Sequence, residues 1–189
     1  MNRDQILEAA AQIFRKKGFH AASMQDIAAA VNLQKASLYH HVSSKQEILL
    51  ALLDQALDLL FDRISAVKKQ DLPADEKLHQ AIHCYLNALT EKADLASVLL
   101  MEHRSLEPEL HARHIPRRDR FERLWRDLIQ EGMDTNLFCA ANAAVAARSL
   151  LGVMNWTITW YRPDGKYSSG QISDRFAALF LDGLRERRV

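Results

Sequence analysis

Residues 23–42 read SMQDIAAAVNLQKASLYHHV, and this stretch has the form of two short helices joined by a tight turn. Ser23 followed by Asp26 is a capping-box-like start for the first helix. Asn32 tolerates the left-handed backbone conformation better than most residues other than glycine, so it can close that helix. A second short helix is expected over residues 35–42. Two such helices, the second opening with polar and basic residues, form a helix-turn-helix.

The second of these helices has one side expected to pack inward and one side that can enter a DNA major groove. On a helical wheel, Leu38 and Val42 share the inward side. On the other side, Gln34 can present its amide to adenine, and Ala36 is small enough to approach a thymine methyl group. The hydroxyl, ammonium and imidazole groups of the remaining candidates suit phosphates or base edges. The predicted DNA-binding residues are Ser23, Gln34, Lys35, Ala36, Ser37, Tyr39, His40 and Lys45.

Helical periodicity continues along the rest of the chain, and β-strand signals are nearly absent. Ser44 and Glu47 form an S-x-x-E capping box before a long helix with one apolar stripe. Pro116 is expected to kink or split a later helix near Ile115, because a mid-helix proline removes a hydrogen bond. The predicted fold is all-α, with nine helices at about residues 3–17, 23–31, 35–42, 44–64, 78–89, 95–101, 107–132, 140–161 and 172–184.

Composition excludes several other classes of protein. The 189 residues are 48% apolar and 26% charged, which is ordinary for a globular protein and not for a disordered or repetitive one. Cys84 and Cys139 stand alone, so neither a disulfide framework nor a cysteine zinc cluster is indicated. No apolar run approaches the roughly 20 residues that a membrane span needs. We therefore expect a soluble cytoplasmic protein that does not bind a membrane.

The net charge of +1 is low for a protein that binds nucleic acid, but the charge is unevenly distributed. Residues 1–50 carry a net charge of +2, and the remainder carries −1. A few well-placed cations and helix N-termini are sufficient to bind phosphates. The low total therefore predicts modest non-specific affinity for DNA and does not exclude DNA binding.

The first 50 residues also follow a known pattern, T-x-x-D-I-A-x-x-x-G-V-S-x-G-x-L-Y-x-H-F-x-S-K-E-x-L. The chain departs from it at Asn32 and Ala36, where glycine is usual, at Gln34, where a small polar residue is usual, and at Val42, where phenylalanine is usual. It matches at Asp26, Ile27, Ala28, Leu38, Tyr39, His41, Ser44, Lys45 and Leu49, with Ser23 near the usual threonine. On these residues the chain resembles the TetR/AcrR family of bacterial transcriptional regulators.

The resemblance implies a three-helix DNA-binding head at residues 1–47 and a six-helix ligand-binding and dimerisation body at residues 48–189. It implies a homodimer whose last two helices pair as a four-helix bundle. The two apolar stripes of residues 172–184 support this independently, because one stripe can face the chain's own core and the other a partner. Two heads suit a pseudo-palindromic double-stranded operator. The implied function is transcriptional repression, released by a small-molecule effector.

Residues 150–165, LLGVMNWTITWYRPDG, resemble a TetR subgroup linked to fatty-acid, aromatic-acid or steroid catabolism. That resemblance implies an acyl-CoA thioester as effector, which needs an apolar tunnel and cations for its phosphates. The same aromatic residues also fit an ordinary core, and the arginine-rich helix also fits a solvated, salt-bridged face. The candidate ligand-binding residues are Leu99, Arg104, Trp125, Leu151, Met154 and Trp156, and no other cofactor is predicted.

Histidine spacing raises a metal hypothesis, because His79 and His83 are four residues apart and share one helix face. No carboxylate completes an H-E-x-x-H motif and no cysteine pair lies nearby, so no metal site is predicted. The chain has no nucleophile elbow, glycine-rich phosphate loop or acid pair, so an enzyme is not expected. The alternative to a repressor is a helical ligand-sensor or protein-interaction module with a vestigial DNA-binding head.

Overall fold

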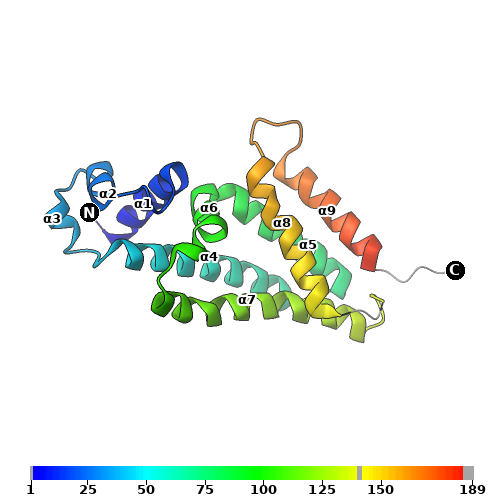
Figure 1. The fold of residues 1–189 in the computed structure, drawn as a ribbon. Coiled ribbons are helices and arrows are strands. Elements are labelled where there is room, and N and C mark those ends of the chain that lie inside the picture. The colour runs from blue at the N-terminus through cyan, green and yellow to red at the C-terminus, as the bar shows by residue number, and fades with distance from the viewer. Residues whose placement is uncertain (1, 140–141, 185–189) are drawn as a thin grey trace. The chain divides into compact units, whose positions relative to one another are not determined.

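The computed structural model describes residues 2–139 and 142–184 and has the all-α fold predicted from the sequence (Figure 1). These residues contain no β-strand. The helices in this part of the chain are α1 (Arg3–Lys17), α2 (Met24–Ala30), α3 (Lys35–Leu38), α4 (Lys45–Lys68), α5 (Ala74–Glu91), α6 (Ala93–Met101), the 3-10 helix η1 (His103–Ser105), α7 (Pro108–Asp134), α8 (Ala143–Trp160) and α9 (Ser169–Leu184).

The chain forms two compact units. The first unit comprises residues 1–58 and 92–118, and the second comprises residues 59–91 and 119–189. Helices α4 and α7 each contribute residues to both units. The first compact unit extends beyond the boundary predicted at residue 47 and includes α6, η1 and the start of α7. The assignment of DNA binding to residues 1–47 and of ligand binding and dimerisation to residues 48–189 stays a prediction.

The first unit is built around the amphipathic helix α1. Ile6, Ala10 and Phe14 recur at helical spacing and are fully buried. They belong to the face of α1 that is covered within this unit, where α1 packs against α2 and α6. Gly18 ends the helix with φ of 78°, a conformation that residues with a side chain rarely adopt.

The start of the first helix of the helix-turn-helix and the turn that follows it are as predicted. Ser23 caps α2 with a complete capping box, and Asn32 has φ of 54° in the turn. The predicted second helix is too long, because α3 ends at Leu38. After it, the backbone N–H of His40 donates to the carbonyl of Ser37, three residues back instead of four, which tightens the chain into a turn.

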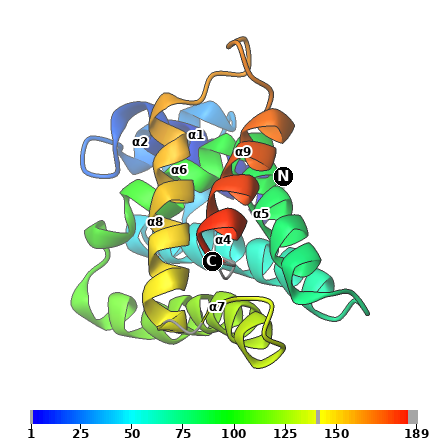
Figure 2. The same ribbon diagram turned by 90° about the vertical axis from the view of Figure 1, so that its right-hand side faces the viewer.

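In the second unit, α5 packs along α9 and against α8 (Figure 2). The core contains Tyr85 of α5 and Phe121 and Trp125 of α7, with Trp125 fully buried. The Tyr85 and Trp125 rings meet edge to face at a centroid distance of 5.6 Å. Such an aromatic pair adds stabilisation beyond the area that it buries.

One predicted feature of the later helices needs correction. Pro116 does not split its helix, since α7 continues from Pro108 to Asp134. The carbonyl that loses its partner belongs to Ala112, and both residues are exposed, so water can satisfy it. Helix α8 begins at Ala143 after the cap Asn142, while residues 140 and 141 of the predicted helix lie outside the described residues.

Within the described chain, no helix is both long and apolar enough to cross a membrane.

Candidate functional site

Helix α3 and the turn after it form the candidate DNA-reading surface. Leu38 and Val42 are buried, as the helical wheel predicts. Because α3 has only four residues, Tyr39 and His40 are presented by a turn instead of a helix. The exposed DNA-binding candidates on this surface are Gln34, Lys35, Ala36, Tyr39 and His40, and Ser37 is half-buried.

Ser23 is exposed, but its hydroxyl already has a role in capping α2. The hydroxyl donates to Asp26 Oδ2 at 2.8 Å and accepts from the Asp26 backbone N–H at 3.1 Å. Lys17 Nζ donates to the other carboxylate oxygen of Asp26 at 2.7 Å. The hydrogen bonds from Lys17 and Ser23 lower the pKa of Asp26 from 3.8 to about 2. A phosphate contact by Ser23 therefore competes with this network and stays a prediction.

Lys45 has a structural role that the sequence reasoning missed. Its ammonium donates to the carbonyls of Phe19 at 2.8 Å and Ala22 at 2.7 Å, and lies 3.4 Å from that of His20. It also lies 4.4 Å from the centroid of the Phe19 ring. The side chain thereby ties the start of α4 to the loop between α1 and α2. The ammonium already donates to these carbonyls. A phosphate contact by Lys45 would therefore have to replace one of these hydrogen bonds.

Contacts within the first unit also tie α1 and the start of α4 to helices that come much later in the chain. Gln46 Nε2 donates to the Ser105 carbonyl at 3.0 Å, and Gln46 Oε1 accepts from the Glu107 backbone N–H at 3.2 Å. Arg15 of α1 pairs with Asp94 of α6 at 2.8 Å. The backbone partners of Gln46 carry no residue-type signal, so the sequence could not reveal them.

Several arginines of α7 and α8 form ion pairs with acidic side chains. This agrees with the alternative interpretation of the arginine-rich helix as a solvated, salt-bridged face. In the first unit, Arg117 pairs with Asp58 at 2.6 Å and with Asp54 at 3.3 Å. In the second unit, Arg148 pairs with Glu122 at 2.9 Å. Partly exposed pairs of this kind contribute little to stability and remain open to exchange with an anionic ligand.

The second unit holds polar atoms that are buried without a protein hydrogen-bond partner. Among the described residues, such side-chain atoms are Ser65 Oγ, His83 Nε2, Trp125 Nε1 and Thr157 Oγ1, and all four lie in this unit. Buried polar groups are normally satisfied, so each exception marks a place where a ligand atom or ion can bind. Near the aromatic cluster, the buried Tyr85 hydroxyl does have a partner and donates to Asn155 Oδ1.

The six predicted ligand-binding residues do not all belong to one unit. Leu99 and Arg104 belong to the first unit, where Leu99 is buried and Arg104 is exposed. The other four belong to the second unit. There Trp125 and Met154 are fully buried, Leu151 is half-buried, and Trp156 is 65% exposed. Their contact with a ligand stays a prediction.

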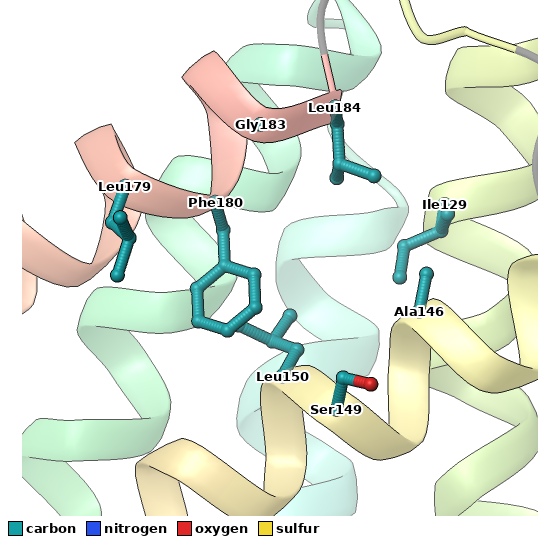
Figure 3. A pocket seen from close by; sticks show the side chains of 8 residues that line it. All are labelled: Ile129, Ala146, Ser149, Leu150, Leu179, Phe180, Gly183 and Leu184. Carbon is teal, nitrogen blue, oxygen red and sulfur yellow. The ribbon is translucent and has the colours of Figure 1, made fainter.

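Helices α8 and α9 expose an apolar face. Ala177 and Leu181 of α9 lie on one predicted stripe and are buried, whereas the other predicted stripe is only partly exposed, with Leu179 65% exposed and Ile172 buried. A cavity of about 320 Å³ lies between the two helices, and Figure 3 shows Phe180 pointing across it toward Leu150. Its lining residues are Ile129, Ala146, Ser149, Leu150, Leu179, Phe180, Gly183 and Leu184.

A capped helix-turn-helix with an outward polar surface, carried by an all-helical chain, defines a helix-turn-helix transcription regulator. Residues 6–52 match the family model of bacterial regulatory proteins of the tetR family, and residues 71–184 match that of the tetracyclin repressor-like C-terminal domain. The chain belongs to the TetR family, as its sequence pattern predicted. This is a family of DNA-binding transcription regulators and not of enzymes.

The similar proteins span nearly the whole chain. The structure of PfmR, a TetR family regulator from Thermus thermophilus, has 34% identity and a TM-score of 0.87 and covers 96% of this chain and 99% of PfmR. AibR in complex with isovaleryl coenzyme A and operator DNA has 28% identity and a TM-score of 0.88, with coverage of 95% and 97%. The transcriptional repressor KstR2 of Mycobacterium tuberculosis is 26% identical over 189 residues, covering 99% of this chain and 94% of KstR2.

Proposed function

We propose that this protein is a homodimeric repressor that binds a double-stranded operator and is released from it by an acyl-CoA thioester. The observation that carries the effector part is the pair of unpartnered polar atoms, Trp125 Nε1 and Thr157 Oγ1, buried in the second unit. AibR, which has a similar fold over 95% of this chain, was solved with an acyl-CoA and operator DNA.

The DNA-reading part of the proposal assigns base contacts to α3 and its N-terminal edge. Gln34 is exposed immediately before α3, where its amide can reach the N6 and N7 atoms of adenine. Ala36, in the first turn of α3, leaves room for a thymine methyl group. Lys35 and Tyr39 are exposed and suit the flanking phosphates.

The homodimer part of the proposal uses the apolar face of α8 and α9. Its exposed members include Val145, Val153, Trp156 and Leu179. Large apolar side chains exposed on two helices are candidates for an interface with a second copy of the chain. Pairing of the two helices with their symmetry mates brings two heads together, as a palindromic operator with half-sites about 34 Å apart requires.

The effector part of the proposal requires one apolar site for the acyl chain and cations for the phosphates. Trp125 and Met154 supply buried apolar surface, and the unpartnered Trp125 and Thr157 atoms can hydrogen-bond to the thioester or its amides. Arginines of the same unit such as Arg148, which pairs with Glu122, are cations that phosphates can recruit.

Release follows from linkage between effector and operator binding. The helix-turn-helix shares its compact unit with α6, η1 and the start of α7, and the Gln46 and Arg15 contacts join these parts. In this proposal an effector displaces α6 or α7, and the contacts of Gln46 and Arg15 pass the displacement to α4 and α1, which flank the helix-turn-helix in the chain. A coupling free energy of about 1 to 3 kcal/mol corresponds to roughly 5- to 150-fold release.

The test is operator binding by the full chain, measured by fluorescence anisotropy with the DNA that flanks its own gene. We expect a specific complex that a panel of acyl-CoAs dissociates, while the matching free acids do not. Gln34→Ala is expected to relax base preference at one position of each half-site while keeping the complex. Absence of a specific complex at any salt concentration would support the alternative, a sensor module with a vestigial head.

A further inference from the structure

Helices α5 and α9 bring three metal-ligand side chains together in the second unit. His79 and His83 lie one turn apart on α5, with ring centroids 4.7 Å apart. Because α9 packs along α5 (Figure 2), Asp174 Oδ1 lies 2.8 Å from His83 Nε2 and 3.9 Å from His79 Nε2. The three ligand atoms all lie within 4.8 Å of one another. The carboxylate that the local sequence of the histidine pair lacks is therefore supplied by a distant helix.

The spacing of these atoms suits one small ion. In a tetrahedral zinc site with bonds of about 2.0 to 2.1 Å, neighbouring ligand atoms are separated by about 3.3 Å. The separations of 2.8 and 3.9 Å lie on either side of that value. All three ligand atoms lie within 4.8 Å of one another, so binding of one ion requires the side chains to rotate until these atoms surround a common centre.

The environment of His83 points to a missing partner. Nε2 is buried and has no hydrogen bond, although Asp174 Oδ1 is only 2.8 Å away, because that oxygen lies off the direction in which the ring nitrogen bonds. Around a shared ion, each ring nitrogen points at the ion, and the neighbouring ligand oxygen lies to one side. The position of Asp174 Oδ1 to one side of His83 Nε2, and the lack of a hydrogen bond to that nitrogen, both agree with such a metal site.

An ion can reach this site while the proposed dimer is intact. The side chains of His79 and Asp174 are 43% and 62% exposed. Asp174 is five residues before Leu179, which places it about 140° around α9 from the exposed apolar stripe at 100° per residue. The histidine cluster and the proposed dimer face therefore lie on different sides of α9.

We propose that His79, His83 and Asp174 bind a divalent transition-metal ion, with Zn²⁺ the best match. Two imidazoles and one carboxylate are ligands of zinc and its neighbours, whereas Mg²⁺ and Ca²⁺ prefer oxygen ligands alone. Three protein ligands leave the fourth position for water or a further donor. The ion joins α5 to α9 and stabilises the second unit when it is bound.

The test is a titration of the untagged, EDTA-treated full chain with Zn²⁺ in competition with a chromophoric chelator. We expect one ion per protomer, and a rise in the thermal unfolding temperature on adding Zn²⁺. Asp174→Asn and His83→Ala are each expected to weaken binding by at least about tenfold, since loss of even an outer-shell partner costs 10- to 100-fold. Co²⁺ as a probe should show a visible absorption band that both variants lose.

Two matched variants control for incidental binding. His111→Ala removes one histidine of another closely spaced pair, His111 and His114, and Asp164→Asn removes an exposed carboxylate of the second unit. Both should bind Zn²⁺ as the parent does. Asp174 is exposed, so Asp174→Asn keeps the fold, which circular dichroism checks. The proposal fails if the parent binds no stoichiometric ion, or if Asp174→Asn and His83→Ala bind as tightly as the parent.

Discussion

The two compact units differ in whether their polar side chains have hydrogen-bond partners. In the first unit, the ammonium of Lys45, the carboxylate of Asp26 and the amide of Gln46 all have protein partners. In the second unit, four buried polar side-chain atoms in the described part of the chain have no hydrogen bond to the protein. A satisfied network holds a surface rigid, whereas an unsatisfied buried atom costs stability unless something binds it. The comparison suggests that the first unit presents a fixed reading surface and the second is adapted to receive a ligand or an ion.

The largest expected effect concerns the exposed apolar face of the second unit. Leu179→Glu would place a charge within the proposed dimer interface, and an uncompensated buried charge costs about 3 kcal/mol or more. We expect the dimer to dissociate at least a hundredfold more readily, as measured by analytical ultracentrifugation. Because Leu179 is 65% exposed within the chain, the helical content should not change. Lys166→Glu, in the exposed loop before α9, is the control, and equal dimerisation by both variants would place the interface elsewhere.

The next effect tests the satisfied network of the first unit. Lys45→Ala leaves the carbonyls of Phe19 and Ala22 without their charged donor and is expected to lower the free energy of unfolding by about 2 kcal/mol in urea titrations. The salt dependence of operator binding should stay as in the parent, while Lys35→Ala reduces its slope by about one unit. A slope reduced by Lys45→Ala with unchanged stability would instead assign Lys45 to a phosphate.

A smaller effect tests the unsatisfied atoms of the second unit. Thr157→Val replaces a buried hydroxyl that has no partner with a methyl group of similar size, so stability should stay within about 0.5 kcal/mol of the parent. The effector concentration for half-release from the operator should rise about tenfold, or 1.4 kcal/mol. Thr159→Val, on the exposed side of the same helix, should leave release unchanged. Equal release by the two variants would remove Thr157 from the effector site.

The smallest effect concerns acid stability of the first unit. The pKa of Asp26 is about 2 in the folded chain and 3.8 as the ordinary value, so the folded state favours the charged form. The stabilisation is therefore fully present above about pH 4 and is lost as the pH falls toward 2. In Asp26→Asn, unfolding measured between pH 2 and 5 should vary less with pH than in the parent. An identical pH profile would mean that the Lys17 and Ser23 bonds do not persist in solution.

Most of the fold was predictable because it follows from helical periodicity and from capping residues such as Ser23 and Asn32. The length of α3 was not, because nothing in the residues 39–41 excludes another helical turn. The role of Lys45 was hidden since its partners are backbone carbonyls, which every residue possesses. Only part of the proposed metal site could be predicted from the sequence. The spacing of His79 and His83 is local, but Asp174 reaches them only through the packing of α9 along α5.

Asn32, at φ of 54°, lies in a turn whose conformation restricts the residue type, while the exposed residues after it are not restricted in this way. The turn accepts only residues that tolerate the left-handed conformation, so β-branched side chains are excluded there. Two residues later, Gln34 is exposed, and neighbours such as Ala36 and His40 are exposed as well. Substitutions at these exposed positions do not disturb the turn. A regulator built in this way can acquire a new operator by drift of a few surface residues, without any change in its fold.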